Sequence, residues 1–88
     1  MQDIIRINQA DNVAVALRPI NKGETLDIGG NAVTAAEDIP QGHKMAIKPI
    51  KSGEEVVKYG FRIGYAKEEI GVGQWIHVHN VKTALGDL

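Results

Sequence analysis

Two of the three histidines in this 88-residue chain lie two positions apart, at His77 and His79, just after Trp75. In a strand successive side chains point to opposite faces, so Trp75, His77 and His79 would share one face and Ile76 and Val78 the other. Neighbouring imidazoles can bind a divalent metal, contact an anionic substrate or exchange protons near neutral pH. The same spacing also fits two polar residues on the exposed face of an edge strand. Trp75 could fill the core or belong to an interface.

His77 and His79 are the candidate metal ligands, although two imidazoles do not complete a catalytic metal site. A third ligand would have to come from Glu24, Asp27 or a partner chain, because no carboxylate lies nearby in the sequence. The chain has no cysteine, which excludes thiolate ligands and disulfides and is compatible with a reducing compartment. We therefore expect this chain alone to bind no metal tightly.

Two further pairs of polar residues could contact a substrate. His43 and Lys44 follow a turn glycine, where they could bind a carboxylate or hydroxy acid, or form an ordinary exposed turn. Asp11 and Asn12 precede an apolar run and could bind substrate, although both residue types are also common turn formers. Tyr59 could donate a hydrogen bond or lie half-buried in the core.

The composition, 43% hydrophobic and 24% charged residues, describes one soluble globular domain. The net charge is −1 and the basic residues are scattered, which argues against nucleic-acid binding through a basic patch. No apolar run approaches the roughly 18 residues that span a bilayer, and the N-terminus lacks a signal-peptide pattern. We therefore expect a cytoplasmic protein with no membrane partner. A chain of this size buries only about 60–65% of its unfolded surface, which favours a partner domain or subunit over a deep private active site.

An internal repeat organises most of the chain: an aliphatic residue, a glycine three positions later, and apolar residues six and eight positions after the start. Glycine allows a backbone angle that a side chain would obstruct, so each copy predicts a turn that leads into a strand. Copies one and two are expected to be related to copies three and four by an approximate internal twofold. Only Lys58 departs from the pattern. The four copies are Ile20, Gly23, Leu26, Ile28; Ile39, Gly42, Met45, Ile47; Ile50, Gly53, Val56, Lys58; and Ile70, Gly73, Ile76, Val78.

The remaining segments also favour strands. Residues 4–8 and 13–17 are rich in β-branched and small apolar residues. Gly29-Gly30-Asn31 predicts a hairpin between residues 26–28 and 32–34. Helical signals are confined to residues 34–38 and 65–69, each barely one turn long. The sequence thus predicts a mostly β domain over residues 1–80 with very short helical turns, and residues 81–88 are expected to begin a linker or C-terminal arm.

Five blocks of the sequence form a specific combination: DNVAVAL (11–17), IPQGHKMA (39–46), KYG (58–60), IGYA (63–66) and HVHN (77–80). In order and spacing they resemble the small N-terminal SAF domain of the altronate and galactarate dehydratase family. The likeness covers residues 4–88 and implies a compact SAF-type β-clip fold. The galactarate branch is not expected to carry the last block.

This resemblance implies the small subunit or N-terminal domain of an altronate-type dehydratase, a hydro-lyase of hexuronate catabolism. Such enzymes remove water from a sugar acid to give a 2-keto-3-deoxy acid, and they use a divalent metal such as iron or manganese. The partner implied is a large catalytic domain or subunit, without which this chain is expected to be inactive. By resemblance, His43, Lys44, His77 and His79 are the residues expected to face the substrate or the metal.

Two other functions remain open at this point. The small subunit of sulfolactate sulfo-lyase has similar blocks, which would mean elimination of sulfite instead of water. Alternatively, the chain is a non-catalytic module that binds substrate or closes over the active site of the large part. A second copy of the chain is a further candidate partner, and the particular acid is not set by these residues.

Overall fold

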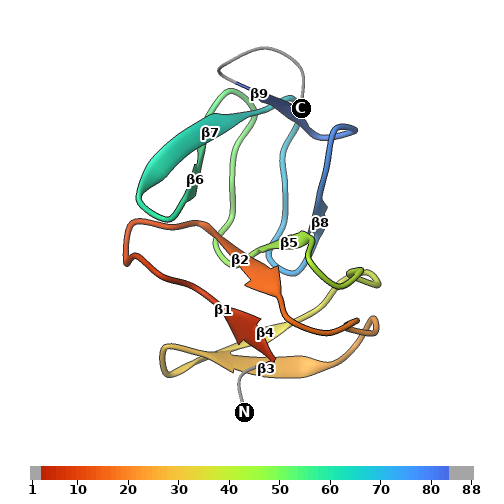
Figure 1. Cartoon of the computed structure of the whole chain (residues 1–88). Coiled ribbons are helices and arrows are strands. Elements are labelled where there is room, and N and C mark those ends of the chain that lie inside the picture. The colour runs from red at the N-terminus through yellow and green to blue at the C-terminus, as the bar shows by residue number, and fades with distance from the viewer. Residues whose placement is uncertain (1–2, 84–88) are drawn as a thin grey trace.

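The computed structural model describes residues 3–83, and within this range the chain forms nine strands and no helix (Figure 1). The prediction of a mostly β fold is confirmed. The helical turns expected at residues 34–38 and 65–69 are wrong, because these segments complete strands and continue as bends. The expected strands at residues 4–8 and 13–17 form but end earlier. The strands are β1 (Ile4–Ile5), β2 (Val13–Ala16), β3 (Thr25–Ile28), β4 (Asn31–Thr34), β5 (Lys44–Ala46), β6 (Glu55–Lys58), β7 (Phe61–Ala66), β8 (Trp75–Ile76) and β9 (Val81–Thr83).

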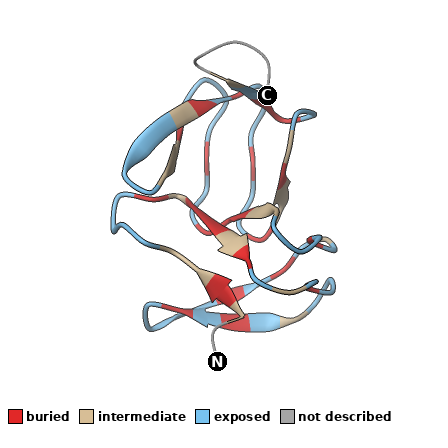
Figure 2. Cartoon of the chain, in the orientation of Figure 1, coloured by how far each residue is buried: buried red, intermediate tan, exposed pale blue. Residues whose placement is uncertain are grey.

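A central antiparallel sheet in the order β1-β2-β5-β8 lies between two smaller sheets (Figure 1). Neighbouring residues of a strand face opposite sides, so the sheet contributes to two separate hydrophobic clusters. Ala14 and Met45 pack with the β3–β4 hairpin on one side. Val13 and Ala46 pack with the β6-β7-β9 sheet on the other. Figure 2 shows buried residues along the strands of all three layers.

The four repeat copies form the same turn. In each, the residue after the glycine donates its N–H to the carbonyl three residues earlier. The glycine takes a positive φ, which an L side chain adopts only at a cost. The φ angles are 91° at Gly23, 82° at Gly42, 85° at Gly53 and 88° at Gly73.

The pairing of the turns follows the grouping expected from the repeat. Ile20 forms a β-bridge with Ile39, and Ile50 forms one with Ile70, so copy one pairs with copy two and copy three with copy four. Each turn also exchanges two backbone hydrogen bonds with a buried alanine, which the repeat pattern did not predict. The glycine N–H groups of the four turns donate, in chain order, to the carbonyls of Ala35, Ala16, Ala66 and Ala46.

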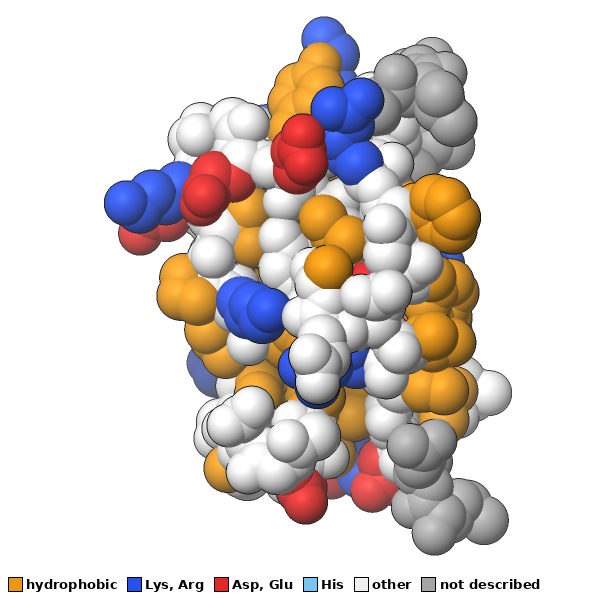
Figure 3. All heavy atoms as spheres, turned by 90° about the vertical axis from the view of Figure 1, so that its left-hand side faces the viewer, with side chains coloured by type: hydrophobic (Ala, Val, Ile, Leu, Met, Phe, Trp, Pro, Cys, Tyr) orange, Lys and Arg blue, Asp and Glu red, His pale blue; other side chains and the backbone are white. Residues whose placement is uncertain are grey.

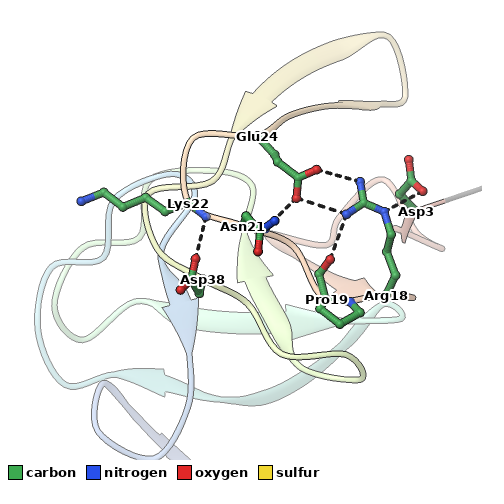
Figure 4. Close-up of polar contacts among 7 residues, drawn as sticks. All are labelled: Asp3, Arg18, Pro19, Asn21, Lys22, Glu24 and Asp38. Atoms are coloured by element: carbon green, nitrogen blue, oxygen red, sulfur yellow. Dashed lines mark hydrogen bonds and ion pairs between the residues drawn. The ribbon is translucent and has the colours of Figure 1, made fainter.

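Arg18 reinforces the first of these turns (Figure 4). Its guanidinium donates to both carboxylate oxygens of Glu24 at 3.1 Å and to Asp3 at 3.0 Å. Glu24 also accepts the N–H of Asn21 within the turn. The hydrogen bond from Arg18 lowers the pKa of Glu24, so this carboxylate stays ionised and remains an acceptor for the turn.

The boundary expected at residue 80 falls at the start of a strand. Val81–Thr83 pairs with β7 in antiparallel register, with Ala66 opposite Val81, and Val81 is buried in the second cluster. Residues 81–83 therefore belong to the folded domain. The rest of the segment expected to begin an arm, residues 84–88, lies outside the described residues.

Charged and apolar side chains are mixed on the face shown in Figure 3, where basic groups do not gather into one patch and no histidine is visible. Within residues 3–83 there is no helix that is long and apolar enough to cross a membrane.

Candidate functional site

Three histidines and one tryptophan meet beside β8. Trp75 lies in β8, His77 and His79 follow it, and His43 immediately precedes β5. The His77 ring stacks on the Trp75 ring, with centroids 5.1 Å apart and planes 7° from parallel. The ring centroid of His43 lies 5.6 Å from that of Trp75 and 5.3 Å from that of His77, and the ring centroid of His79 lies 5.5 Å from that of Trp75. We call these four residues the imidazole–indole cluster.

The strand expected through His79 ends at Ile76 instead, because Asn80 folds the chain into a turn. The Asn80 side chain accepts the N–H of His77 at 3.0 Å and donates to the carbonyl of Trp75 at 2.8 Å. Ile76 is buried as expected, whereas Val78 is 47% exposed instead of packing beside it. His77 and His79 still lie on the Trp75 side, but the turn places them there.

Asn80 is thus a positioning residue that the sequence did not single out. It is 4% exposed, although asparagine is usually a surface residue. The signal in the sequence was an asparagine directly after the two histidines, because asparagine side chains commonly form hydrogen bonds with the backbone groups of a turn.

The turn that carries His43 differs from the other three. In those turns the residue after the glycine is Glu24, Glu54 or Gln74, and its side chain accepts the N–H three residues earlier at 2.5–2.6 Å. Figure 4 shows this arrangement for Glu24. In the second turn the residue three positions earlier is Pro40, which has no N–H to donate. Position 43 is therefore released from capping the turn and carries an imidazole.

Lys44 follows His43 in sequence but belongs to the other side of the central sheet. Its cross-strand partners are Val15 and Ile76, and Ile76 packs in the second cluster, whereas the His43 ring contacts Trp75 at the edge of the first. Burial lowers the pKa of Lys44, and the nearby charge of Lys58 lowers it further. The structure therefore does not bring His43 and Lys44 together.

Asp11 and Asn12 connect the first part of the chain to the hairpin formed by β6 and β7. The buried Asp11 carboxylate accepts the N–H groups of Gly60 at 2.7 Å and Asn8 at 3.1 Å. Burial alone would raise the pKa of Asp11, but these backbone hydrogen bonds outweigh it and lower the pKa. Asn12 accepts from Val57 and donates to the carbonyl of Glu55, both at 2.8 Å. Their polar groups are thus engaged in holding the fold.

Tyr59 lies at the tip of the β6–β7 hairpin instead of in the core. It takes a φ of 55° and is 39% exposed, with the Lys58 ammonium 4.9 Å above its ring. The two-residue turn formed with Gly60 requires positive φ at both positions, which explains why the ring is carried outward.

The described residues do not fit a self-contained metal centre. Within residues 3–83 no group of three or more histidine, cysteine, aspartate or glutamate side chains is arranged to hold a metal ion. Glu37, which approaches the cluster, uses a carboxylate oxygen to accept the Trp75 backbone N–H at 3.0 Å. Any metal at this cluster would need ligands from elsewhere.

The chain thus combines a three-layer β fold with an imidazole–indole cluster beside β8. Its residues 2–84 match the family model "Altronate/galactarate dehydratase SAF domain". The chain belongs to this family.

Three relatives show how such domains occur. The chain is 48% identical to an altronate dehydratase of Bacillus subtilis (strain 168), over 100% of this chain and 18% of the relative. It is 43% identical to an altronate dehydratase of Escherichia coli (strain K12) over 96% of this chain and 17% of the relative. It is also 44% identical to the (2R)-sulfolactate sulfo-lyase subunit alpha of Paracoccus pantotrophus over 67% of this chain and 88% of that subunit. The chain thus spans less than a fifth of the altronate dehydratases it matches.

Proposed function

We propose that this chain is the SAF part of an altronate-type dehydratase and works with a much larger catalytic part. The observation that supports this most directly is the likeness to two altronate dehydratases over at least 96% of the chain. Their additional length would supply the larger part. Action in the cytoplasm, within hexuronate catabolism, belongs to the same proposal.

The reaction proposed is removal of water from a sugar acid. A base takes the proton from the carbon next to the carboxylate, an acid protonates the neighbouring hydroxyl, which leaves as water, and the resulting enol becomes a 2-keto-3-deoxy acid. The imidazole–indole cluster is the part of this chain that we assign to the substrate. Its three imidazoles supply hydrogen-bonding groups: His77 and His79 are supported by β8 and the Asn80 turn, and His43 by the turn that leads into β5.

A divalent metal, iron or manganese, belongs to the complete enzyme in this proposal. It would assist departure of the hydroxyl as a Lewis acid. His77 and His79 are the two ligands that this chain would offer, and the larger part would supply the others. Such sharing agrees with the lack of a self-contained metal cluster in residues 3–83.

Elimination of sulfite is the second candidate, favoured by the 44% identity to a sulfo-lyase subunit that the chain nearly covers. Parallel assays of the complete enzyme on altronate and sulfolactate separate the two. We expect 2-keto-3-deoxy acid from altronate and no sulfite from sulfolactate. Release of sulfite with no turnover of altronate would replace the first proposal by the second.

A further inference from the structure

The hydrogen bond between Trp75 and His43 defines the protonation of one imidazole. The indole Nε1 lies 3.1 Å from Nδ1 of His43. An indole N–H can only donate, so Nδ1 must be unprotonated to accept it. His43 is therefore neutral in this arrangement, and its single ring proton is on Nε2. This tautomer is assigned from the hydrogen bond, because the indole N–H of Trp75 cannot act as an acceptor.

Trp75 is held firmly enough to impose this choice. Its backbone N–H donates to Glu37 at 3.0 Å, and its carbonyl accepts from the buried Asn80 at 2.8 Å. One face of the ring stacks on His77, and the side chain packs against the first hydrophobic cluster. Rotating the indole away from His43 would break the stacking and this packing together.

The second turn also prepares the other partner. In the other three turns, the side chain after the glycine accepts a backbone N–H three residues earlier. Pro40 occupies that earlier position in the second turn and has no N–H, so the His43 side chain does not bond to its own turn. Its Nδ1 faces Trp75 instead. The departure from the repeat and the indole hydrogen bond therefore have the same result, a histidine of fixed orientation.

We propose that Trp75 is a positioning residue that holds His43 as the neutral Nε2–H tautomer, so that His43 donates a hydrogen bond to a carboxylate or hydroxyl oxygen of the acid substrate. In this state neither nitrogen of His43 is a metal ligand, because Nδ1 accepts from Trp75 and Nε2 carries the proton. That leaves His77 and His79 as the imidazoles with lone pairs for a metal. The tautomer follows from the geometry alone, whereas the identity of the acceptor rests on the proposed function.

Nitrogen NMR of the full chain, labelled at histidine, tests the tautomer directly. Spectra are recorded at about pH 8.5, above the pKa of about 6.5 for free histidine, and His43→Gln assigns the His43 signals. We expect the proton of His43 on Nε2 alone in the unmodified chain. A proton on Nδ1, or a mixture of tautomers, would overturn the proposal without the need for any variant of Trp75.

Trp75→Phe then tests the role of the indole, because phenylalanine keeps an aromatic ring beside His77 and has no N–H donor, although its ring is smaller than the indole and fills less of the space beside the first hydrophobic cluster. The His43 tautomers should become mixed. In the complete enzyme acting on altronate, kcat should fall about two- to tenfold, the value of one neutral hydrogen bond. An unchanged tautomer would refute positioning by Trp75, and a changed tautomer with unchanged kcat and KM would refute the donor role. If the enzyme does not act on altronate at all, the proposed function fails while the NMR result stands.

Discussion

Replacing both His77 and His79 by alanine is expected to lower the turnover of altronate by the complete enzyme about 100- to 10,000-fold, the usual contribution of a positioned acid or base. Both rings contact Trp75, and they are the groups that we propose to face substrate or metal. The variant should still fold, because Asn80 bonds to the backbone of residues 75 and 77 and not to the imidazoles. Steady-state kinetics with iron or manganese supplied measures the effect.

Val78→Ala is the matched control, since its exposed side chain lies between the two histidines in the same turn. It should leave turnover within about twofold of the unmodified enzyme, as expected for an exposed side chain without a specific role. Sedimentation should show the histidine variant bound to the larger part as tightly as the control. Normal turnover by that assembled variant would favour a module that only binds substrate or closes over the site.

Gly73→Ala is expected to lower the free energy of unfolding more than alanine at a turn glycine that has open space around it. The added Cβ would overlap the carbonyl oxygen of Thr34 and lie 2.8 Å from the amide nitrogen of Ala36, both of them backbone atoms. The φ of 88° adds strain of about 1–2 kcal/mol for any residue with a side chain. The collision should add about 1–3 kcal/mol. Urea unfolding of the full chain measures the sum.

Gly53→Ala separates the two costs, because Gly53 has a φ of 85° and open space where the Cβ would be. This variant should lose only the strain of about 1–2 kcal/mol. Equal losses in the two variants would show that the backbone next to Gly73 moves away without cost. Since Gly73 is two residues before Trp75, Gly73→Ala should also disturb the imidazole–indole cluster, which Gly53→Ala should not.

The turns could be predicted from the sequence because they are local. A glycine at a fixed distance after an isoleucine specifies a positive φ and a hydrogen bond across four residues, and both occur in every copy. The hairpin at Gly29 and Gly30 was predictable for the same reason. The four alanines that exchange backbone hydrogen bonds with the turns were not predictable, since these bonds join segments that are distant in the sequence.

The site was only partly accessible to such reasoning. The two-residue spacing of His77 and His79 indicated a shared side, and both contact Trp75. The strand alternation invoked for them was the wrong cause, because the Asn80 side chain ends β8 at Ile76. The contact of His43 with Trp75 spans 32 positions and depends on the pairing of β5 with β8, which no local pattern specifies.

The adjacency of His43 and Lys44 in the sequence did not indicate where their side chains lie. Adjacent polar residues after a turn suggested a joint anion site, but β5 begins at Lys44, and alternation along the strand directs the two side chains to different sides of the sheet. Asp11 was also an ambiguous residue in the sequence. Its long-range bond to Gly60 could be recognised only once the hairpin tip was placed beside it.

Turnover of altronate by the larger part of the enzyme, prepared without residues 1–88 and assayed before and after this chain is added, tests the proposed function most directly. Iron or manganese is present throughout, and sedimentation confirms that the two parts associate. We predict that 2-keto-3-deoxy acid forms only after the chain is added and that its rate of formation saturates as the larger part becomes fully bound. Equal turnover without the chain would contradict a role for the imidazole–indole cluster in the reaction.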